Sequence, residues 1–324
     1  MSCITYRPYR GPEELAGMAA AEARLRAQLG LMRGINLAAM EHQFAHLVNC
    51  EPPTDCLVVE RDGAAAGYTQ AEWHDLADGD RIYEIKTVVE PAAWDLGIAD
   101  ALLAWGEARL EVIARTHPRD RRCWYAAYAY DGDEESVAAL TGRGYEAVRW
   151  DAEMLRPDLA NLPAVQLPGG YTFRTPEEHE LPGVFELMVA AFAEHWGEYD
   201  AGDQRFDDWV SDPRFRGDLV AVAWQGDTPA VCLTGFLEPA PDGTVRGCLE
   251  SLATHPGHRR RGLGRAAMAE SLRLLHKAGA TSAWLGVDTD NPNMALGLYE
   301  ACGFRVVTRN ATYRKPFEHW ENHR

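Results

Sequence analysis

The chain contains one sequence pattern twice, and an internal repeat constrains the fold more than any other feature of a sequence. Residues 89–99 align with residues 254–264, and residues 144–150 align with residues 303–309. A chain of 324 residues is long enough for two domains of about 150 residues each. We therefore predict two copies of one fold, arranged in tandem.

The repeat also predicts the domain boundaries. Each copy ends at a basic residue followed by proline, at Arg156-Pro157 and at Lys315-Pro316. Between the copies, the chain is rich in Pro, Gly and Leu and has no helical period, which is typical of a linker. The predicted order is a first domain over 1–157, a linker over 158–170 and a second domain over 171–324.

The two copies predict the same order of elements. A short strand precedes a helix, over 12–29 in the first copy and 177–192 in the second. Strands separated by turns follow, then a strand–turn–helix unit, another strand (122–130 or 282–287), a helix and closing strands. This order predicts an α/β fold with helices against a sheet.

A turn rich in glycine and arginine, residues 255–265, lies between the apolar run 248–253 and the amphipathic run 266–278. Glycines let a ligand approach the backbone, and the start of a helix carries about half a positive charge. The chain as a whole has a net charge of −17, so this local cationic cluster is unusual. It predicts an anion-binding site at the start of the helix.

Composition excludes several classes of protein. The acidic balance argues against a nucleic-acid partner, and no apolar run approaches the ~18 residues of a membrane span. The seven cysteines are scattered and form no Cys-x-x-Cys pair, which predicts reduced thiols and no zinc or other metal site. With no secretion signal at the N-terminus, we expect a cytoplasmic protein, either monomer or homodimer.

The chain resembles the GCN5-related N-acetyltransferases (GNAT), and within them the mycothiol synthase-like proteins. The resemblance covers both copies and rests on Arg259-x-x-Gly262-x-Gly264 after a strand, on Leu298-Tyr299 and Gly303-Phe304 further on, and on the segment 191–197. It implies two tandem GNAT folds, each a mixed, mostly antiparallel sheet flanked by helices.

The resemblance implies acetyl-CoA as the acetyl donor. Amides of the turn would hold the pyrophosphate, and the strand before it would pair with the pantetheine amides. The residues that it assigns to the donor are Leu252, Ala253, Thr254, Arg259, Arg260, Arg261, Gly262, Leu263, Gly264, Arg265 and Asn291. For Asn291 the spacing is one residue longer than usual in the family. The alternative is a plain strand-to-helix connection with solvated arginines.

Two residues are predicted to be catalytic. Tyr299 would protonate the departing thiolate, or else it is a core aromatic residue that holds its helix to the sheet. An alkylamine is neutral only at a cost of about 4–5 kcal/mol at pH 7, so a base would help. Glu250 is the candidate base because alternation places it on the face of Leu252, and the alternative is an ordinary solvent-facing carboxylate.

The acceptor is predicted to be a primary amine of a small molecule. The resemblance places its pocket at residues after the first helix of the second copy, namely Glu194, His195, Trp196 and Tyr199. The alternative is that these are ordinary surface residues at the end of a helix. His255 and His258 lie beside the turn and are predicted to be turn or phosphate-side residues.

The first copy lacks the residues for this chemistry. Trp94 stands at the position of Arg259, Asp95 lies inside the turn, and Leu140 stands at the position of Tyr299. A carboxylate beside a pyrophosphate is repulsive. We therefore predict a structural first domain and a catalytic second domain in an acetyl-CoA-dependent N-acetyltransferase. The alternatives are a CoA-binding sensor or scaffold without catalysis, and a protein N-acetyltransferase.

Overall fold

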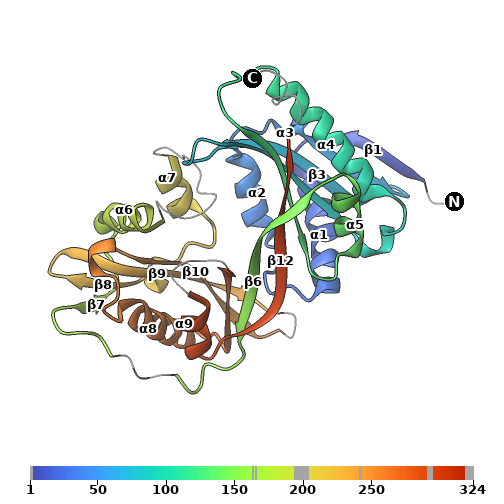
Figure 1. Ribbon diagram of the computed structural model, residues 1–324. Helices are drawn as coiled ribbons and strands as arrows, with labels where there is room; N and C mark the ends of the chain where they lie inside the picture. The colour runs from blue at the N-terminus through green and yellow to red at the C-terminus, as the bar shows by residue number, and fades with distance from the viewer. Residues whose placement is uncertain are drawn as a thin grey trace. The chain divides into compact units, whose positions relative to one another are not determined.

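The computed structural model describes residues 3–162, 164, 166–192, 204–240, 243–289 and 295–317. The chain divides into two compact units (Figure 1). Unit 1 comprises Met1–Trp150 together with Thr308–Arg324, and unit 2 comprises Asp151–Val307. Among the described residues, none of the helices is both long and apolar enough to span a membrane.

Unit 1 is a mixed sheet flanked by helices, with the strand order β1-β2-β3-β4-β5-β12. All pairs in it are antiparallel except β4 with β5. Its elements in chain order are β1 (Ile4–Pro8), α1 (Leu15–Leu29), α2 (Leu37–Ala45), α3 (Pro52–Asp55), β2 (Cys56–Arg61), β3 (Ala64–Asp75), β4 (Arg81–Val89), α4 (Ile98–Ala114), β5 (Cys123–Tyr130), α5 (Glu134–Gly142), the start of β6 (Glu146–Arg156) and most of β12 (Arg305–Pro316).

Unit 2 has the corresponding sheet, in the order β6-β11-β10-β9-β8-β7, with only β10 and β11 parallel. Helix α6 covers one face of this sheet and α8 covers the other (Figure 1). The elements of unit 2 between β6 and β12 are β7 (Thr172–Arg174), α6 (Leu181–Phe192), α7 (Gln204–Ser211), β8 (Ala221–Gln225), β9 (Thr228–Pro239), β10 (Val245–Thr254), α8 (Leu263–Lys277), β11 (Ser282–Asp288) and α9 (Ala295–Ala301).

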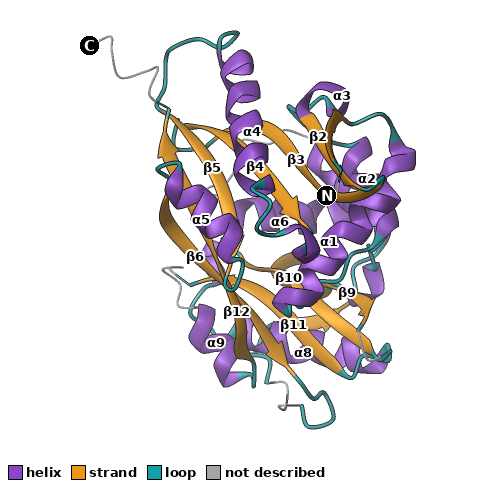
Figure 2. Cartoon of the chain, turned by 90° about the vertical axis from the view of Figure 1, so that its right-hand side faces the viewer, coloured by secondary structure: helices purple, strands orange, loops and turns teal. Residues whose placement is uncertain are grey.

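The predicted fold class is confirmed in both units, where strands form a mostly antiparallel sheet with helices along it (Figure 2). The first predicted helix of each copy begins with a short 3-10 turn, Pro12–Glu14 in unit 1 and Glu178–Glu180 in unit 2. The amphipathic run after the arginine-rich turn is α8, whose apolar side lies in the core of unit 2.

The last strand of the first copy, β6, pairs in the sheet of unit 2, and the last strand of the second copy, β12, pairs in the sheet of unit 1. Residues 151–156 of β6 pair with β11, whereas residues 310–316 of β12 pair with β5. Ala152 and Met154 are fully buried in the core of unit 2. The compact units therefore differ from the predicted domains, because a repeat in sequence assigns each closing strand to the copy that contains it.

The predicted linker packs on unit 2. The side chain of Leu159 is fully buried in the core of unit 2, and its amide donates a hydrogen bond of 3.1 Å to the carbonyl of Thr281. The guanidinium of Arg156 donates to the carbonyls of Asp158 and Asn161 at 3.0 and 2.6 Å and to that of Cys302. Leu159 is therefore a core residue, and Leu162 and Leu167 are partly buried against the same core.

Candidate active site

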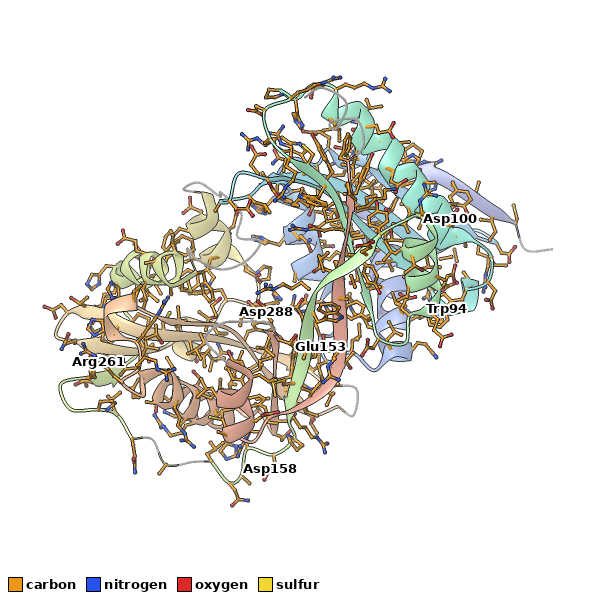
Figure 3. The ribbon with its side chains drawn as sticks, in the orientation of Figure 1. Trp94, Asp100, Glu153, Asp158, Arg261 and Asp288 are labelled. Carbon is orange, nitrogen blue, oxygen red and sulfur yellow. The ribbon has the colours of Figure 1, made fainter. Side chains whose placement is uncertain are left out.

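Strands β10 and β11 separate halfway along unit 2. Their parallel pairing covers Arg246 to Leu249 opposite Ser282 to Leu285. Beyond this point β10 continues to Thr254, and β11 continues to Asp288 while paired with β6 (Figure 3). The described strands thus leave one edge of residues 252–254 open, and an open edge can pair with an extended ligand.

A β-bulge in β10 changes the sequence-based argument for Glu250. Leu249 faces Gly235 and Leu252 faces Leu233, so Glu250 and Ser251 together lie opposite Thr234. The amide of Ser251 donates a hydrogen bond of 3.1 Å to the hydroxyl of Thr234. Strict alternation, on which the placement of Glu250 relied, is interrupted here, because an extra residue reverses the alternation that follows.

The turn before α8 holds backbone amides at the helix start. Arg260 has φ 61°, in the left-handed region, and Gly262 caps the helix with φ 82°. In the described part of the chain, the amides of residues 260–265 have no hydrogen-bond acceptor, and the first closed turn runs from Ala266 to the carbonyl of Gly262 at 3.1 Å. Such an array of amides is the usual binding site for a phosphate group.

The four arginines of the turn have different surroundings. Arg259 donates to the carbonyls of Thr254 and Ala191, at 3.4 and 3.1 Å. Arg261 donates to the Tyr171 hydroxyl and to the Gly257 carbonyl, at 3.0 and 3.1 Å (Figure 3). The side chains of Arg260 and Arg265 are exposed and have no partner among the described residues. These two guanidinium groups are therefore available to an anion.

The two histidines of the turn are structural. His255 accepts the amide of Gly257 at its Nδ1, at 3.1 Å. His258 shares a hydrogen bond of 2.8 Å between its Nδ1 and the Tyr171 hydroxyl. Burial and the charges of Arg261 and His255 lower the pKa of His258. Both rings therefore form hydrogen bonds that hold the turn, and a contact to a phosphate stays a prediction.

Gly264 lies where the helix start faces the end of β10 and the side of α9. A Cβ atom built on it would lie 3.7–3.9 Å from Leu298, Leu252 and Thr254, which is ordinary contact distance. The protein itself therefore tolerates an alanine here. The space that this methyl group would fill is the space beside the open edge of β10.

The variant Gly264→Ala should weaken ligand binding without weakening the folded state. We expect equal or higher stability, by up to about 1 kcal/mol, because alanine is the better helix residue. We expect the Kd of acetyl-CoA to rise about 10-fold or more, because overpacking a site costs about 1–3 kcal/mol. Thermal unfolding and calorimetric titration measure both quantities, and unchanged affinity would show that the donor does not pass Gly264.

Tyr299 projects from α9 into the core of unit 2. It is 9% exposed and packs against Phe304, with ring centroids 6.3 Å apart. No described residue forms a hydrogen bond with its hydroxyl. Burial raises the pKa of Tyr299 to about 12, so the phenol keeps its proton at neutral pH. Tyr299 therefore packs in the core, and its role as a general acid stays a prediction.

Glu250 is exposed at the bulge, and an arginine that the sequence did not reveal lies near it. Arg214 forms a two-pronged ion pair with Asp212, with a shortest distance of 2.7 Å, and stacks 4.7 Å above the ring of Phe236. The hydrogen bond to Asp212 raises the pKa of Arg214, and the charge of Glu250 raises it further. Burial acts in the opposite direction and is outweighed. The Asp-Pro-Arg turn in the sequence was the only signal for this arginine.

The predicted acceptor residues Glu194, His195, Trp196 and Tyr199 lie outside the described residues, as does Asn291. Leu252, Ala253 and Thr254 are at the open edge of β10, and Leu263 is buried at the start of α8. The structure thus brings the turn, the open edge, Gly264 and the helix of Tyr299 together.

Unit 1 has a turn of the same backbone shape, but here a side chain of the protein accepts the amides. Asp95 has φ 64° and Gly97 caps α4 with φ 70°, as Arg260 and Gly262 do in unit 2. Here the carboxylate of Glu135, from the first turn of α5, accepts the amides of Asp95 and Ala99 at 3.2 and 3.5 Å. A side chain of the protein therefore occupies the place where unit 2 has unpaired amides.

The rest of the groove in unit 1 is also filled. Ala99, at the position of Gly264, is 1% exposed and packs with Ala139, at the position of Leu298. Leu140 is a core residue, and Asp100, at the position of Arg265, forms an ion pair of 3.1 Å with Arg143 (Figure 3). Trp94 packs against two apolar clusters.

Glu135→Ala tests the role of this carboxylate. We expect a loss of about 1 kcal/mol in stability, because two amides at a helix start lose their anionic acceptor. Glu134→Ala is the matched control, since Glu134 is an exposed acid in the same helical turn. Denaturant unfolding measures both variants, and equal effects would contradict the assignment.

A family model described as the acetyltransferase (GNAT) family matches residues 18–134 and 181–304, one match in each copy. The mycothiol acetyltransferase of Geodermatophilus obscurus is 31% identical over 272 residues, covering 81% of this chain and 82% of that protein. The mycothiol acetyltransferase of Clavibacter michiganensis is 29% identical over 311 residues, covering 94% and 92%.

Solved structures of similar fold also cover nearly the whole chain. A GCN5-related N-acetyltransferase from Sphaerobacter thermophilus superimposes with a TM-score of 0.74 at 20% identity, covering 97% of this chain and 95% of that one. A tandem GNAT protein from the clavulanic acid biosynthesis pathway has a TM-score of 0.70 at 18% identity, covering 97% and 98%.

Proposed function

The chain belongs to the GNAT family as an acetyl-CoA-dependent N-acetyltransferase, and we propose that unit 2 carries the reaction and acetylates the primary amine of a small molecule. One observation supports the choice of unit more than any other. The two units share a turn of the same backbone shape, but its amides are open in unit 2 and accepted by Glu135 in unit 1.

The residues of unit 2 fit the donor at three points. The amides of the turn, with Arg260 and Arg265, match the charge of a pyrophosphate. The open edge of residues 252–254 matches the amide groups of a pantetheine arm. Gly264 leaves room beside that edge. We also propose that the donor contacts Asn291, Arg259 and Arg261. The guanidinium groups of the two arginines already donate hydrogen bonds within the protein.

Tyr299 would act as the general acid. In the reaction a bond forms between the amine nitrogen and the carbonyl carbon, the carbon–sulfur bond breaks, and the thiolate takes a proton. A phenol with a pKa of about 12 holds that proton over the whole working range of pH. Its buried position also keeps bulk water away from the hydroxyl.

Glu250 would take the proton that the amine loses, directly or through a water molecule. Most alkylamines are protonated at pH 7, so removing the proton offsets a cost of about 4–5 kcal/mol. The guanidinium of Arg214 lies near the carboxylate of Glu250, whose charge raises the pKa of Arg214. The bulge presents Glu250 as an exposed side chain on the strand that leads to the open edge.

We also propose which amine accepts the acetyl group. The matched relatives are named mycothiol acetyltransferases, so the unacetylated precursor of mycothiol is the first acceptor to test. Glu194, His195, Trp196 and Tyr199 remain the proposed acceptor residues. We propose that unit 1 is structural, that the protein works in the cytoplasm, and that the sequence-based domains 1–157 and 171–324 mark the two copies of the ancestral fold.

The experiment is a panel of amines assayed with acetyl-CoA. The panel holds the unacetylated mycothiol precursor, aminoglycosides, simple alkylamines and a peptide with a free N-terminus. Released CoA and the mass of the product are measured together. Acetylation of a small amine supports the proposal. Acetyl-CoA binding without any acetylation would favour the sensor or scaffold, and acetylation of the peptide alone would favour a protein acetyltransferase.

A further inference from the structure

A row of polar side chains lies on one face of the sheet in unit 1, away from the turn and from Glu135. Gln70, Glu72 and His74 alternate along β3, and Glu84 lies opposite Glu72 on β4. Side chains two residues apart on a strand share a face. All four are buried or half-buried. The acetyl-transfer chemistry proposed for unit 2 does not use any of them.

Two carboxylates face each other in this row. Glu72 and Glu84 are direct partners in the register of β3 and β4. Like charges directly opposite one another destabilise a sheet, and partial burial strengthens the repulsion. The pair therefore requires a positive charge nearby.

His74 lies beside this pair of carboxylates. Its Nε2 lies 3.1 Å from Oε1 of Glu72. One ligand atom from each of the three residues lies within 4.8 Å of the other two.

Gln70 provides a second and independent observation. It is 2% exposed, and its Nε2 donates a hydrogen bond of 2.7 Å to Oε2 of Glu72, so its amide lies against the carboxylate pair. Its Oε1 is buried without any hydrogen-bond partner. An unpaired buried carbonyl costs about 1–3 kcal/mol. A cation beside Glu72 would give this oxygen a partner.

We propose that Glu72, His74 and Glu84, with the amide oxygen of Gln70, bind a divalent transition-metal ion of the zinc or manganese type. One imidazole nitrogen and several carboxylate or amide oxygens form a donor set that suits these ions. Ligand atoms on opposite sides of such an ion lie about 4.2 Å apart, at about 2.1 Å each from the metal. The three ligand atoms already lie within 4.8 Å of one another, so small side-chain rotations would bring them to these distances.

The neighbouring cations do not oppose this site. Lys86 lies opposite Gln70, but its Nζ is 3.5 Å from Oε2 of Glu22. The other oxygen of Glu22 accepts Arg26 at 2.8 Å. The bound ion would bridge β3 and β4, which is a structural role.

The test is calorimetric titration of the full-length protein, stripped with a chelator, with ZnCl₂ and with MnCl₂. The ligand variants are Glu84→Gln and His74→Ala. The matched control is His42→Ala. The rings of His42, half-buried on α2, and of His46, exposed at the end of this helix, lie 4.2 Å apart and could chelate an ion adventitiously.

We expect one ion per chain for the wild type and for His42→Ala. Affinity in each ligand variant should fall more than 100-fold, since even outer partners of a ligand contribute about 10- to 100-fold. The wild type should also melt at a higher temperature with the ion, which tests the site even where a variant fails to fold. Absence of binding at about 100 µM ion, or binding that only His42→Ala removes, would overturn the proposal.

Discussion

Replacing Tyr299 by phenylalanine is expected to lower kcat by about 10²- to 10⁴-fold, the usual contribution of a general acid. The change removes a hydroxyl group without a described partner and keeps the ring against Phe304, so stability should stay the same. The affinity for acetyl-CoA should also stay nearly the same, because the turn and the open edge are intact. Steady-state kinetics, calorimetry and thermal unfolding measure these three quantities.

Tyr145→Phe is the matched control, since Tyr145 is a buried tyrosine at the position of Phe304 in the other copy. It should leave kcat unchanged. A Tyr299→Phe enzyme with full kcat at saturating substrates would remove Tyr299 from the chemistry and leave it as a core residue. A loss of stability that matches the loss of activity would point the same way.

Arg260→Glu is expected to raise the Kd of acetyl-CoA by about 30- to 100-fold, because charge-assisted contacts to a phosphate are strong and the new carboxylate repels it. The side chain is exposed and has no described partner, so the fold should not change. Calorimetric titration with acetyl-CoA and with CoA gives the affinities, and circular dichroism gives the fold.

The reverse change in unit 1 is the control. Asp95→Arg places an arginine at the corresponding position, but Glu135 still accepts the amides and Ala99 still fills the groove. We therefore expect no additional acetyl-CoA site. Wild-type affinity in Arg260→Glu would show that the turn does not hold the donor.

The sequence was sufficient for the fold class because glycines mark the turns of both copies. Gly97 and Gly262 cap their helices with positive φ, and Gly144 and Gly303 end the next helices in the same way. The exchange of closing strands was not predictable, because β6 and β12 have the alternating pattern that either sheet can accept. The packing of Leu159 was missed for a similar reason, because a short apolar segment without helical periodicity is predicted to be a linker.

The candidate site was predictable where it depends on local backbone shape and not where it depends on distant contacts. The open amides before α8 follow from the glycine and arginine pattern itself. Glu135 reaches Asp95 across 40 residues, and Arg214 reaches Phe236 across a separate strand, so neither has a signal in sequence spacing. The bulge at Glu250 depends on the register with β9, which a single strand does not encode.

Only one of the two similar turns should bind acetyl-CoA, and native mass spectrometry can count the bound ligands. The wild-type chain, Arg260→Glu and Asp95→Arg are each mixed with an excess of acetyl-CoA, and the number of ligands per chain is counted. We expect one ligand per wild-type chain, one per Asp95→Arg chain and a large loss of bound ligand in Arg260→Glu. Two ligands per wild-type chain, or one that persists in Arg260→Glu, would contradict this expectation.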